Sequence, residues 1–338
     1  RPFGNNSCCT RRTGMQVPLC RHVIPRGRVL CADRLKGDAV KTIFVACVLC
    51  LIASCGTPTA TPPATPVPAA TSSGPSATSS AVPTTVAPAV PRPDHVVVVV
   101  EENRSYADVI GRPDAPYLNS LAERGALFTS SFAVSHPSEP NYLALFSGAT
   151  HGLTDDSCPH TFPGANLGAQ LLSAGLTFAG YSEGLPAVGA TVCSAGSYAR
   201  KHNPWVDFAT VPAAANQPFR AFPGDYTRLP TVSFVIPDLA DDMHDGSVSQ
   251  GDGWLRANLD GYVRWALAHR SLLIVTWDED DFSQANQIPT IVVGGLVKPG
   301  RYAEHIDHYS VLHTVEAAYG LPAIGVSAAP VTDCWGAS

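Results

Sequence analysis

Acidic side chains follow three separate apolar runs of the sequence, and each group lies where a strand would end. Glu101, Glu102 and Asn103 follow the first run, Asp238 follows the second, and Asp278–Asp281 follow the third. The runs are His95–Val100, Val232–Ile236 and Leu272–Trp277. Carboxylates that converge on one place repel one another unless a cation neutralises them. The pattern therefore predicts a divalent metal site, and its oxygen donors leave Ca, Mg, Mn and Zn as candidates.

The elements that must position these acids have the pattern of alternating strands and helices. Further apolar runs lie at Leu127–Val134, Thr177–Tyr181 and Pro289–Val293. Helical periodicity predicts one helix from a cap at Asp252 through Ala266 and another from Ser310 to Ala318, ended by Gly320. This alternation predicts an α/β fold, a doubly wound and mostly parallel sheet with helices on both faces. Such sheets carry their sites at the carboxyl ends of the strands, where the acids lie.

Five segments of the folded region carry a family resemblance. They are HVVVVVEENRS (95–105), HPSEPNY (136–142), MHDGS (243–247), VTWDEDD (275–281) and DHYSVL (307–312). In this order and spacing they resemble the bacterial acid phosphatase/phospholipase C phosphoesterase family, and the resemblance covers residues 94–337. It implies an alkaline-phosphatase-like fold for a catalytic domain at 94–338, in agreement with the strand and helix pattern.

The resemblance implies that Ser138 is the nucleophile. Local chemistry supports this, because Pro140 suits the first turn of a helix that would start at Ser138, and the N–H groups of a helix N-terminus favour phosphate. The same resemblance places Glu102, Asn103, Asp278 and Glu279 around a metal ion beside Ser138. Such an ion would activate the serine and polarise the phosphoryl oxygens.

Histidines provide the proton-transfer candidates. His244 and His308 either donate a proton to the leaving group or bind phosphate, or they complete a second metal site with Asp238; the first role is favoured. Asn103, Asn141 and His136 are candidates for substrate contact. Five other histidines are expected to be structural or to lie on the surface: His151, His160, His202, His305 and His313.

These roles imply an acid phosphatase that hydrolyses phosphate monoesters through a phosphoserine intermediate. The substrate would be a small phosphorylated molecule or a phosphoinositide headgroup, including phosphoinositide 3-phosphates. A phosphodiesterase or phospholipase C of the same family is the alternative, and a non-catalytic surface lipoprotein is another. A net charge of −6 without a Lys/Arg cluster disfavours nucleic acid as a partner, and we expect a monomer.

The first 93 residues predict export and a membrane tether. Residues 1–39 have the character of an untranslated or disordered extension, and 40–55 have that of a signal peptide whose apolar core is too short to span a bilayer. Small residues lead into Cys55, as in a lipoprotein processing box, so Cys55 is the candidate for lipidation. The Pro/Thr/Ala/Ser-rich stretch 56–93 cannot bury a core and predicts a solvated tether.

Cysteine usage agrees with an exported, oxidised protein. Of ten cysteines, the folded region holds Cys158, Cys193 and Cys334. Cys158 and Cys193 both lie in Gly/Ser/Pro-rich loop sequence, so we expect them to form a disulfide. Cys334, near the terminus, is left as the candidate free thiol.

Overall fold

A computed structural model of the chain describes residues 90–336. The predicted extension, signal peptide and Cys55 lie outside this range, as does the predicted tether up to residue 89. The end of that tether belongs to the domain, because Val90 packs against the core and the Arg92 guanidinium lies over the Tyr319 ring. Within the described residues, no helix has the length and apolarity to cross a membrane.

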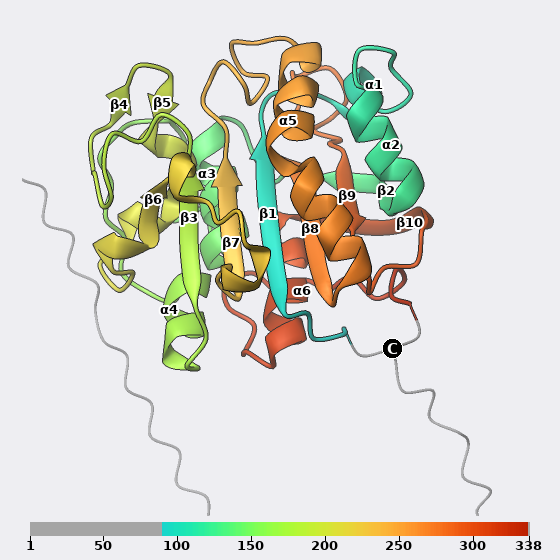
Figure 1. The fold of residues 1–338 in the computed structure, drawn as a ribbon. Coiled ribbons are helices and arrows are strands. Elements are labelled where there is room, and N and C mark those ends of the chain that lie inside the picture. Colours follow the sequence, from blue (N-terminus) through green and yellow to red (C-terminus); the bar gives the residue numbers. More distant parts are fainter. Residues whose placement is uncertain (1–89, 337–338) are drawn as a thin grey trace, which may run out of the picture. The chain divides into compact units, whose positions relative to one another are not determined.

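A mixed sheet of eight strands forms the centre of the domain (Figure 1). Its strand order is β10-β2-β9-β8-β1-β7-β3-β6. The bounds are β1 His95–Glu101, β2 Ala126–Phe132, β3 Phe178–Ser182, β6 Asn216–Pro218, β7 Val232–Ile236, β8 Ser271–Trp277, β9 Thr290–Val293 and β10 Gly300–Asp307. β1 pairs in parallel with both β7 and β8, whereas β9 runs antiparallel to its neighbours β8 and β2. The predicted α/β class and mostly parallel sheet are confirmed.

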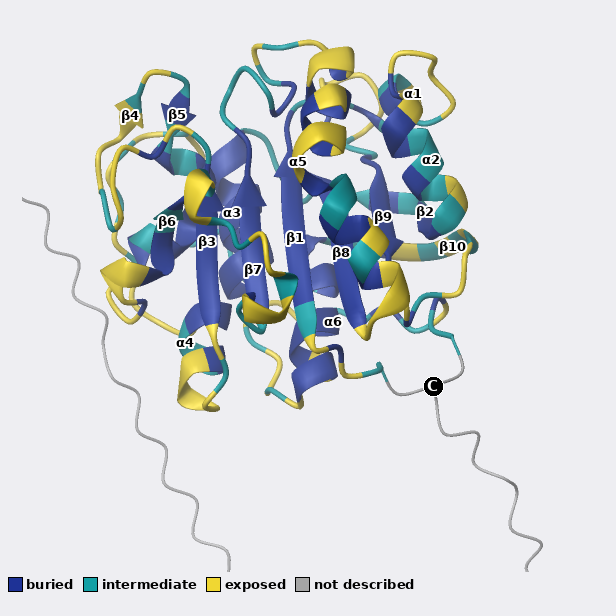
Figure 2. Cartoon of the chain, viewed as in Figure 1, coloured by how far each residue is buried: buried dark blue, intermediate teal, exposed yellow. Residues whose placement is uncertain are grey.

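Helices cover both faces of this sheet. They are α1 Tyr106–Val109, α2 Pro116–Arg124, α3 Ser138–Ser147, α4 Leu167–Ser173, α5 Val248–Ala268 and α6 His308–Tyr319. The short 3₁₀ turns are η1 Arg200–His202, η2 Pro204–Asp207, η3 Ala213–Ala215, η4 Phe219–Ala221 and η5 Tyr226–Arg228. A separate two-stranded sheet is formed by β4 Ser194–Ala195 and β5 Tyr198–Ala199. Figure 2 shows the central strands as buried and the exposed residues mainly in loops and on outer helix faces.

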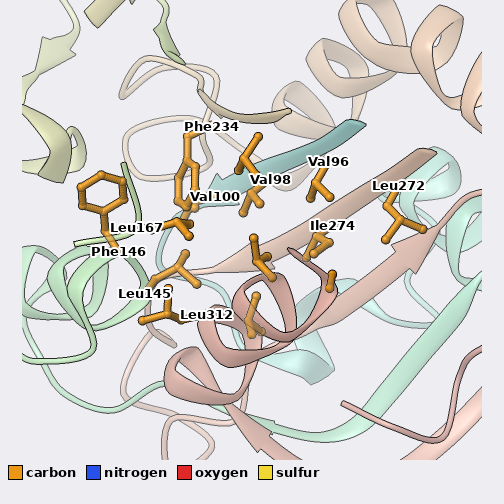
Figure 3. Close-up of a cluster of buried hydrophobic side chains, with 14 of the residues drawn as sticks. Val96, Val98, Val100, Leu145, Phe146, Leu167, Phe234, Leu272, Ile274 and Leu312 are labelled. Carbon is orange, nitrogen blue, oxygen red and sulfur yellow. The ribbon is translucent and has the colours of Figure 1, made fainter. Parts of the chain in front are cut away.

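The alternation of side chains along β1 divides the core into two clusters. Val96, Val98 and Val100 belong to the cluster that includes residues of α3 and α6, as Figure 3 shows with Leu145 and Leu312. Val97 and Val99 belong to the cluster on the other face, with residues of α2 and α5. A strand buried on both faces is apolar at every position, which explains the continuous valine run in the sequence.

The start of α5 differs from the prediction. Ser247 caps this helix, its side chain accepting from Gln250 N, so the helix begins one turn before Asp252. The Asp252 carboxylate instead accepts hydrogen bonds from the backbone N–H groups of Tyr117 and Leu118, at distances of 3.1 and 2.7 Å. Asp252 therefore satisfies the first turn of α2, a neighbouring helix that the periodicity of its own segment could not reveal.

The disulfide expected between Cys158 and Cys193 is present, with the two Cα atoms 5.8 Å apart. It connects the loop after α3 to the segment that leads into β4. Cys334 is buried and has no disulfide partner among residues 90–336.

Candidate active site

Ser138 is the first residue of α3, and all ten residues of this helix are buried. Pro140 lies in its first turn, as the sequence predicted. The Ser138 hydroxyl donates toward two carboxylate oxygens, Glu102 Oε2 at 3.2 Å and Glu279 Oε1 at 3.4 Å. The helix N-terminus thus presents a hydroxyl at the carboxyl end of the sheet, although the Glu139 N–H already donates to Asp156 Oδ1 at 3.0 Å and Pro140 has no N–H. The positive end of the helix dipole at this point favours an anion.

Carboxylates from two adjacent strands converge beside this hydroxyl. Asp278 follows β8, its N–H donates to Glu101 O at 2.9 Å, and its Oδ1 accepts from Asn103 N at 3.1 Å. Asn103 has a φ of 50°, a left-handed conformation that asparagine tolerates better than most residues. Burial, together with the Glu102 and Glu279 carboxylates, raises the pKa of Asp278 well above its usual range.

Glu102 and Glu279 occupy contrasting environments. Burial raises the pKa of Glu279 to about 8, and the nearby Glu102 and Asp156 charges act in the same direction. Burial alone would also raise the pKa of Glu102, but the imidazole of His202, the Lys201 ammonium and the Tyr142 hydroxyl lower it to about 2. Glu102 therefore carries the stable negative charge of the site.

A buried layer behind Glu102 holds this carboxylate in place. Tyr142 donates its hydroxyl to Glu102 Oε1 at 2.5 Å, and its ring stacks on His202 with centroids 4.9 Å apart. His202 Nε2 lies 2.9 Å from Glu102 Oε1, although without hydrogen-bond geometry, and its Nδ1 lies 3.5 Å from Asp242 Oδ2. Burial raises the pKa of Asp242 to about 10, with the Glu102 charge contributing.

Lys201 supplies an ammonium group at the nucleophile. Its Nζ lies 3.4 Å from Ser138 Oγ and donates to Asp156 Oδ2 at 2.7 Å. Burial would lower the pKa of Lys201, but the Glu102, Asp156 and Asp278 carboxylates outweigh that effect and raise it. A permanent positive charge therefore faces Ser138, where it can bind a phosphoryl oxygen.

His136 lies on the opposite side of Glu279 from Ser138. Its Nδ1 is 2.7 Å from Glu279 Oε2, within ion-pair reach but without hydrogen-bond geometry, and its Nε2 is 3.3 Å from Asp280 Oδ1. Asp280 is fully buried and accepts from the backbone N–H groups of the turn that follows it. The structure thus places His136 beside the carboxylates, and Asp280 supports the turn.

Three of the expected site residues are engaged elsewhere. Asn141 uses both amide hydrogens on Ser135 O and Pro137 O, and its Oδ1 accepts from two backbone N–H groups, so it fixes the loop before α3 and has no donor left for substrate. His308 is buried, with Nε2 at 2.9 Å from Trp277 O, whereas its Nδ1 has no hydrogen-bond partner among the described residues. Asp238 belongs to a separate acidic group with Glu183 and Asp241.

His244 lies near the edge of the site. Its backbone N–H donates to Asp242 Oδ1 at 2.8 Å, and its Nδ1 lies 2.8 Å from Asp245 Oδ1. The side chain is partly exposed. It is connected to the buried layer only through Asp242, which faces His202.

The donor set fits a divalent cation. Buried oxygen atoms without a hydrogen-bond partner remain on Asp278 (Oδ2), Glu279 (Oε2) and Asp242 (Oδ2). One group of three residues, Glu102, His202 and Asp242, has ligand atoms within 4.8 Å of one another. Such uncompensated buried acids are costly unless they are protonated or bound to a cation. The group differs from the predicted one, because it includes His202 and Asp242.

Sequence reasoning missed Tyr142, Asp156 and Asp242, and the neighbouring pair Lys201 and His202. Lys201 and His202 lie in η1, a single turn between irregular segments, so no periodic pattern marks them. The run Arg200-Lys201-His202, three basic residues in a domain with few lysines, was the available signal. His202 was assigned to the structural histidines, whereas the structure places it between two buried carboxylates.

The chain belongs to the Phosphoesterase family, whose sequence profile matches residues 112–322. It is 59% identical over 256 residues to the phosphatidylinositol-3-phosphatase of Mycobacterium tuberculosis, an alignment that covers 74% of this chain and 85% of that protein. It is 30% identical over 245 residues to an acid phosphatase of Aspergillus fumigatus, which covers 66% of this chain and 54% of the fungal protein. These relationships identify the chain as a phosphoric monoester hydrolase.

A solved structure shares the fold. A Vibrio parahaemolyticus protein of the alkaline phosphatase superfamily superposes with a TM-score of 0.50 at 14% identity, covering 70% of this chain and 69% of that one. At this identity the likeness concerns the fold alone, and it agrees with the expected alkaline-phosphatase-like architecture.

Proposed function

We propose that the protein hydrolyses phosphate monoesters by double displacement, with Ser138 as the nucleophile. The observation that carries the proposal is the position of the Ser138 hydroxyl, at a helix N-terminus and between the Glu102 and Glu279 carboxylates and the Lys201 ammonium. A nucleophile needs an acceptor for its proton and a positive charge for the phosphoryl group. All three groups are within 3.4 Å of Ser138 Oγ.

In the first step the Ser138 oxygen attacks phosphorus as the bond to the alcohol oxygen breaks. The serine proton passes to Glu102, the ionised one of the two carboxyl groups toward which the hydroxyl donates. Lys201 stabilises the charge on the phosphoryl oxygens, and the dipole of α3 acts in the same sense. In the second step water attacks the phosphoserine and gives one proton to the imidazole that protonated the alcohol. The carboxyl group returns its proton to the Ser138 oxygen as the bond to phosphorus breaks and phosphate is released.

The departing alcohol needs a proton, and we assign this role to His244, with His136 as the other imidazole close to the site. His244 is partly exposed and paired with Asp245, so it can exchange protons with solvent. His308 is less suited to the role, because burial lowers its pKa and its Nε2 is bound to a backbone carbonyl.

Glu102, His202 and Asp242 have ligand atoms close enough to hold a divalent cation, and Asp278 and Glu279 offer further unpartnered oxygens, with Asn103 adjacent. When bound, it would neutralise these acids and polarise the phosphoryl oxygens. The donors are mostly oxygen with one imidazole, which is compatible with Ca, Mg, Mn or Zn.

The proposed substrate is the phosphate of a phosphoinositide 3-phosphate or another small monoester. The 59% identity to a protein named phosphatidylinositol-3-phosphatase supports this class. A phosphodiesterase or phospholipase C activity is the competing proposal, since the core motifs serve either reaction.

Rapid quenching with an aryl phosphate monoester tests the proposal. We expect a phosphorylated peptide containing Ser138, and turnover several orders of magnitude lower in Ser138→Ala. Ser249→Ala, an exposed serine of α5, is the matched control and should behave as wild type. Turnover in Ser138→Ala within about tenfold of wild type would exclude the nucleophile. Faster cleavage of the matching diester would favour the phosphodiesterase.

Export with a lipid anchor at Cys55 remains part of the proposal. The Cys158–Cys193 disulfide supports an oxidising compartment. Metabolic labelling with a fatty acid should mark the full chain, and Cys55→Ser should remove the label. Equal labelling of both chains would rule out lipidation at this residue.

We also propose that the protein is a monomer. Sedimentation of the exported protein would test this.

A further inference from the structure

Phe282 is the most exposed large hydrophobic residue in the described part of the chain. Its exposed fraction is 78%, against 53% for the next residue, Val188. It lies in the turn after β8, the strand whose carboxyl end carries Asp278 and Glu279. Single exposed apolar residues are common on protein surfaces, so exposure alone assigns nothing to Phe282.

The turn that carries Phe282 is held by a buried carboxylate. Phe282 N donates to Asp280 Oδ1 at 2.8 Å, and Gln284 N and Asn286 N donate to Asp280 Oδ2 at 2.8 and 3.0 Å. The Asn286 side chain also donates to Ser135 O at 2.8 Å, which joins the turn to the loop before α3. The backbone of Phe282 has a φ of 66°, rare for a bulky residue. The ring is therefore presented from a braced turn.

One face of the Phe282 ring covers His136. The ring centroids are 3.9 Å apart with planes at 18°, a stacked arrangement. His136 Nδ1 lies 2.7 Å from Glu279, and the other oxygen of Glu279 lies 3.4 Å from Ser138 Oγ. A continuous series of contacts thus leads from the nucleophile to this ring, which places Phe282 at the mouth of the site.

From this geometry we infer that Phe282 is a specificity-determining residue that packs against the alcohol part of the substrate. The inference rests on the proposed phosphatase function. With one face on His136, the ring has its other face and its edges open to solvent. Such a surface suits an alcohol that is itself a ring. An aryl group offers a flat face, and the inositol ring offers C–H groups, because most of its hydroxyls are equatorial. An open-chain alcohol such as glycerol offers less matching surface.

The first test compares substrates in the active enzyme. The ratio of kcat/KM for phenyl phosphate to that for glycerol phosphate should fall about fivefold in Phe282→Ala, the magnitude of an aromatic contact. The ratio for inositol monophosphate to glycerol phosphate should fall similarly. Phe282→Tyr keeps the ring and should keep both ratios within about twofold of wild type. Leu267→Ala removes an exposed apolar side chain near the end of α5 and should change neither rate nor ratio.

The second test measures binding without turnover. In Ser138→Ala protein, calorimetry should show that Phe282→Ala weakens phenyl phosphate and inositol monophosphate about fivefold more than it weakens glycerol phosphate. This comparison separates the two proposals. If wild-type turnover does not depend on Ser138, the proposed function fails while the binding ratio still decides the role of Phe282.

Equal losses for all three esters in both tests would overturn the inference and assign Phe282 to the positioning of His136. Rates and affinities that remain at the wild-type level for all three esters would overturn it as well. A loss confined to phosphoinositide vesicles, with the soluble ring esters unaffected, would assign the ring to contact with the lipid surface and contradict the alcohol contact.

Discussion

Replacing Lys201 with glutamine gives the sharpest test of the site, because this residue was identified by the structure and not by the sequence. Its Nζ lies 3.4 Å from Ser138 Oγ, among the carboxylates of Glu102, Asp278 and Glu279. An incoming phosphate dianion meets these negative charges together with one permanent positive charge. Removing that charge should therefore weaken both phosphate binding and the transition state.

The expected magnitude follows from the loss of one preorganised charged donor, about 3 kcal/mol, which corresponds to roughly a hundredfold in kcat/KM. The inhibition constant of inorganic phosphate should rise in the same variant. Asp156→Asn leaves the ammonium in place but removes its 2.7 Å ion pair, so a smaller loss of about tenfold is expected.

The assay is steady-state hydrolysis of an aryl phosphate, with thermal melting to show that each variant is folded. Lys298→Gln is the matched control, since Lys298 is the other lysine of residues 90–336 and is exposed. It should retain wild-type kinetics. A folded Lys201→Gln protein within about threefold of wild-type kcat/KM, with unchanged phosphate inhibition, would refute a role for this ammonium in phosphate binding.

Four further outcomes are expected. Changing Cys158 and Cys193 to serine should lower the free energy of unfolding by about 3 to 4 kcal/mol, since the bridge closes a loop of 35 residues; denaturation midpoints equal to wild type would contradict this. Burial raises the pKa of Glu139 to about 8, so its contribution to stability is full below pH 4.5 and is lost as pH rises to about 8. Glu139→Gln should reduce the decline of the melting temperature between pH 4.5 and about 8. The same decline in the variant and the wild type would show that Glu139 does not cause it. His244→Asn should slow the hydrolysis of alkyl phosphates far more than that of aryl phosphates, because an aryl alcohol leaves without needing a proton. Equal losses of rate for both substrates, together with a loss of bound metal, would identify His244 as a metal ligand instead. A divalent cation should raise the melting temperature of wild type but not of Asp278→Asn, and equal shifts in both would place the cation elsewhere.

The sequence predicted those parts of the fold that depend on burial. Fully buried strands are apolar at every position, so β1, β7 and β8 were located within a residue of their bounds. β10 was not predicted, because exposed and partly buried positions alternate along much of it, only Ile306 is buried, and several of its residues are charged or polar. β6 at the sheet edge is only three residues long and includes a proline, which gives no strand pattern.

The site was predictable where the topology of the sheet decides it. Glu102 and Asp278 follow parallel neighbouring strands, so their proximity follows from the order of strands. Lys201 reaches Ser138 from a 3₁₀ turn on an irregular segment, a path that no periodicity or strand order encodes. Asn141 was predicted to contact the substrate because it is a polar residue in a matching motif. Its side chain instead hydrogen-bonds to the backbone of the loop before α3.

The two glutamates at the nucleophile show most clearly what a sequence cannot contain. Glu102 and Glu279 are the same residue type, each following a buried strand, yet their pKa values are held near 2 and near 8. The difference comes from His202 and Tyr142, which contact Glu102 and are distant from it in the sequence, whereas Lys201 lowers the pKa of both glutamates. With no cation bound, Glu279 holds its proton at neutral pH while Glu102 is ionised. Cation binding at these acids must therefore release the proton of Glu279, and also those of Asp278 and Asp242 where they serve as ligands, so the affinity of the site for a cation rises with pH.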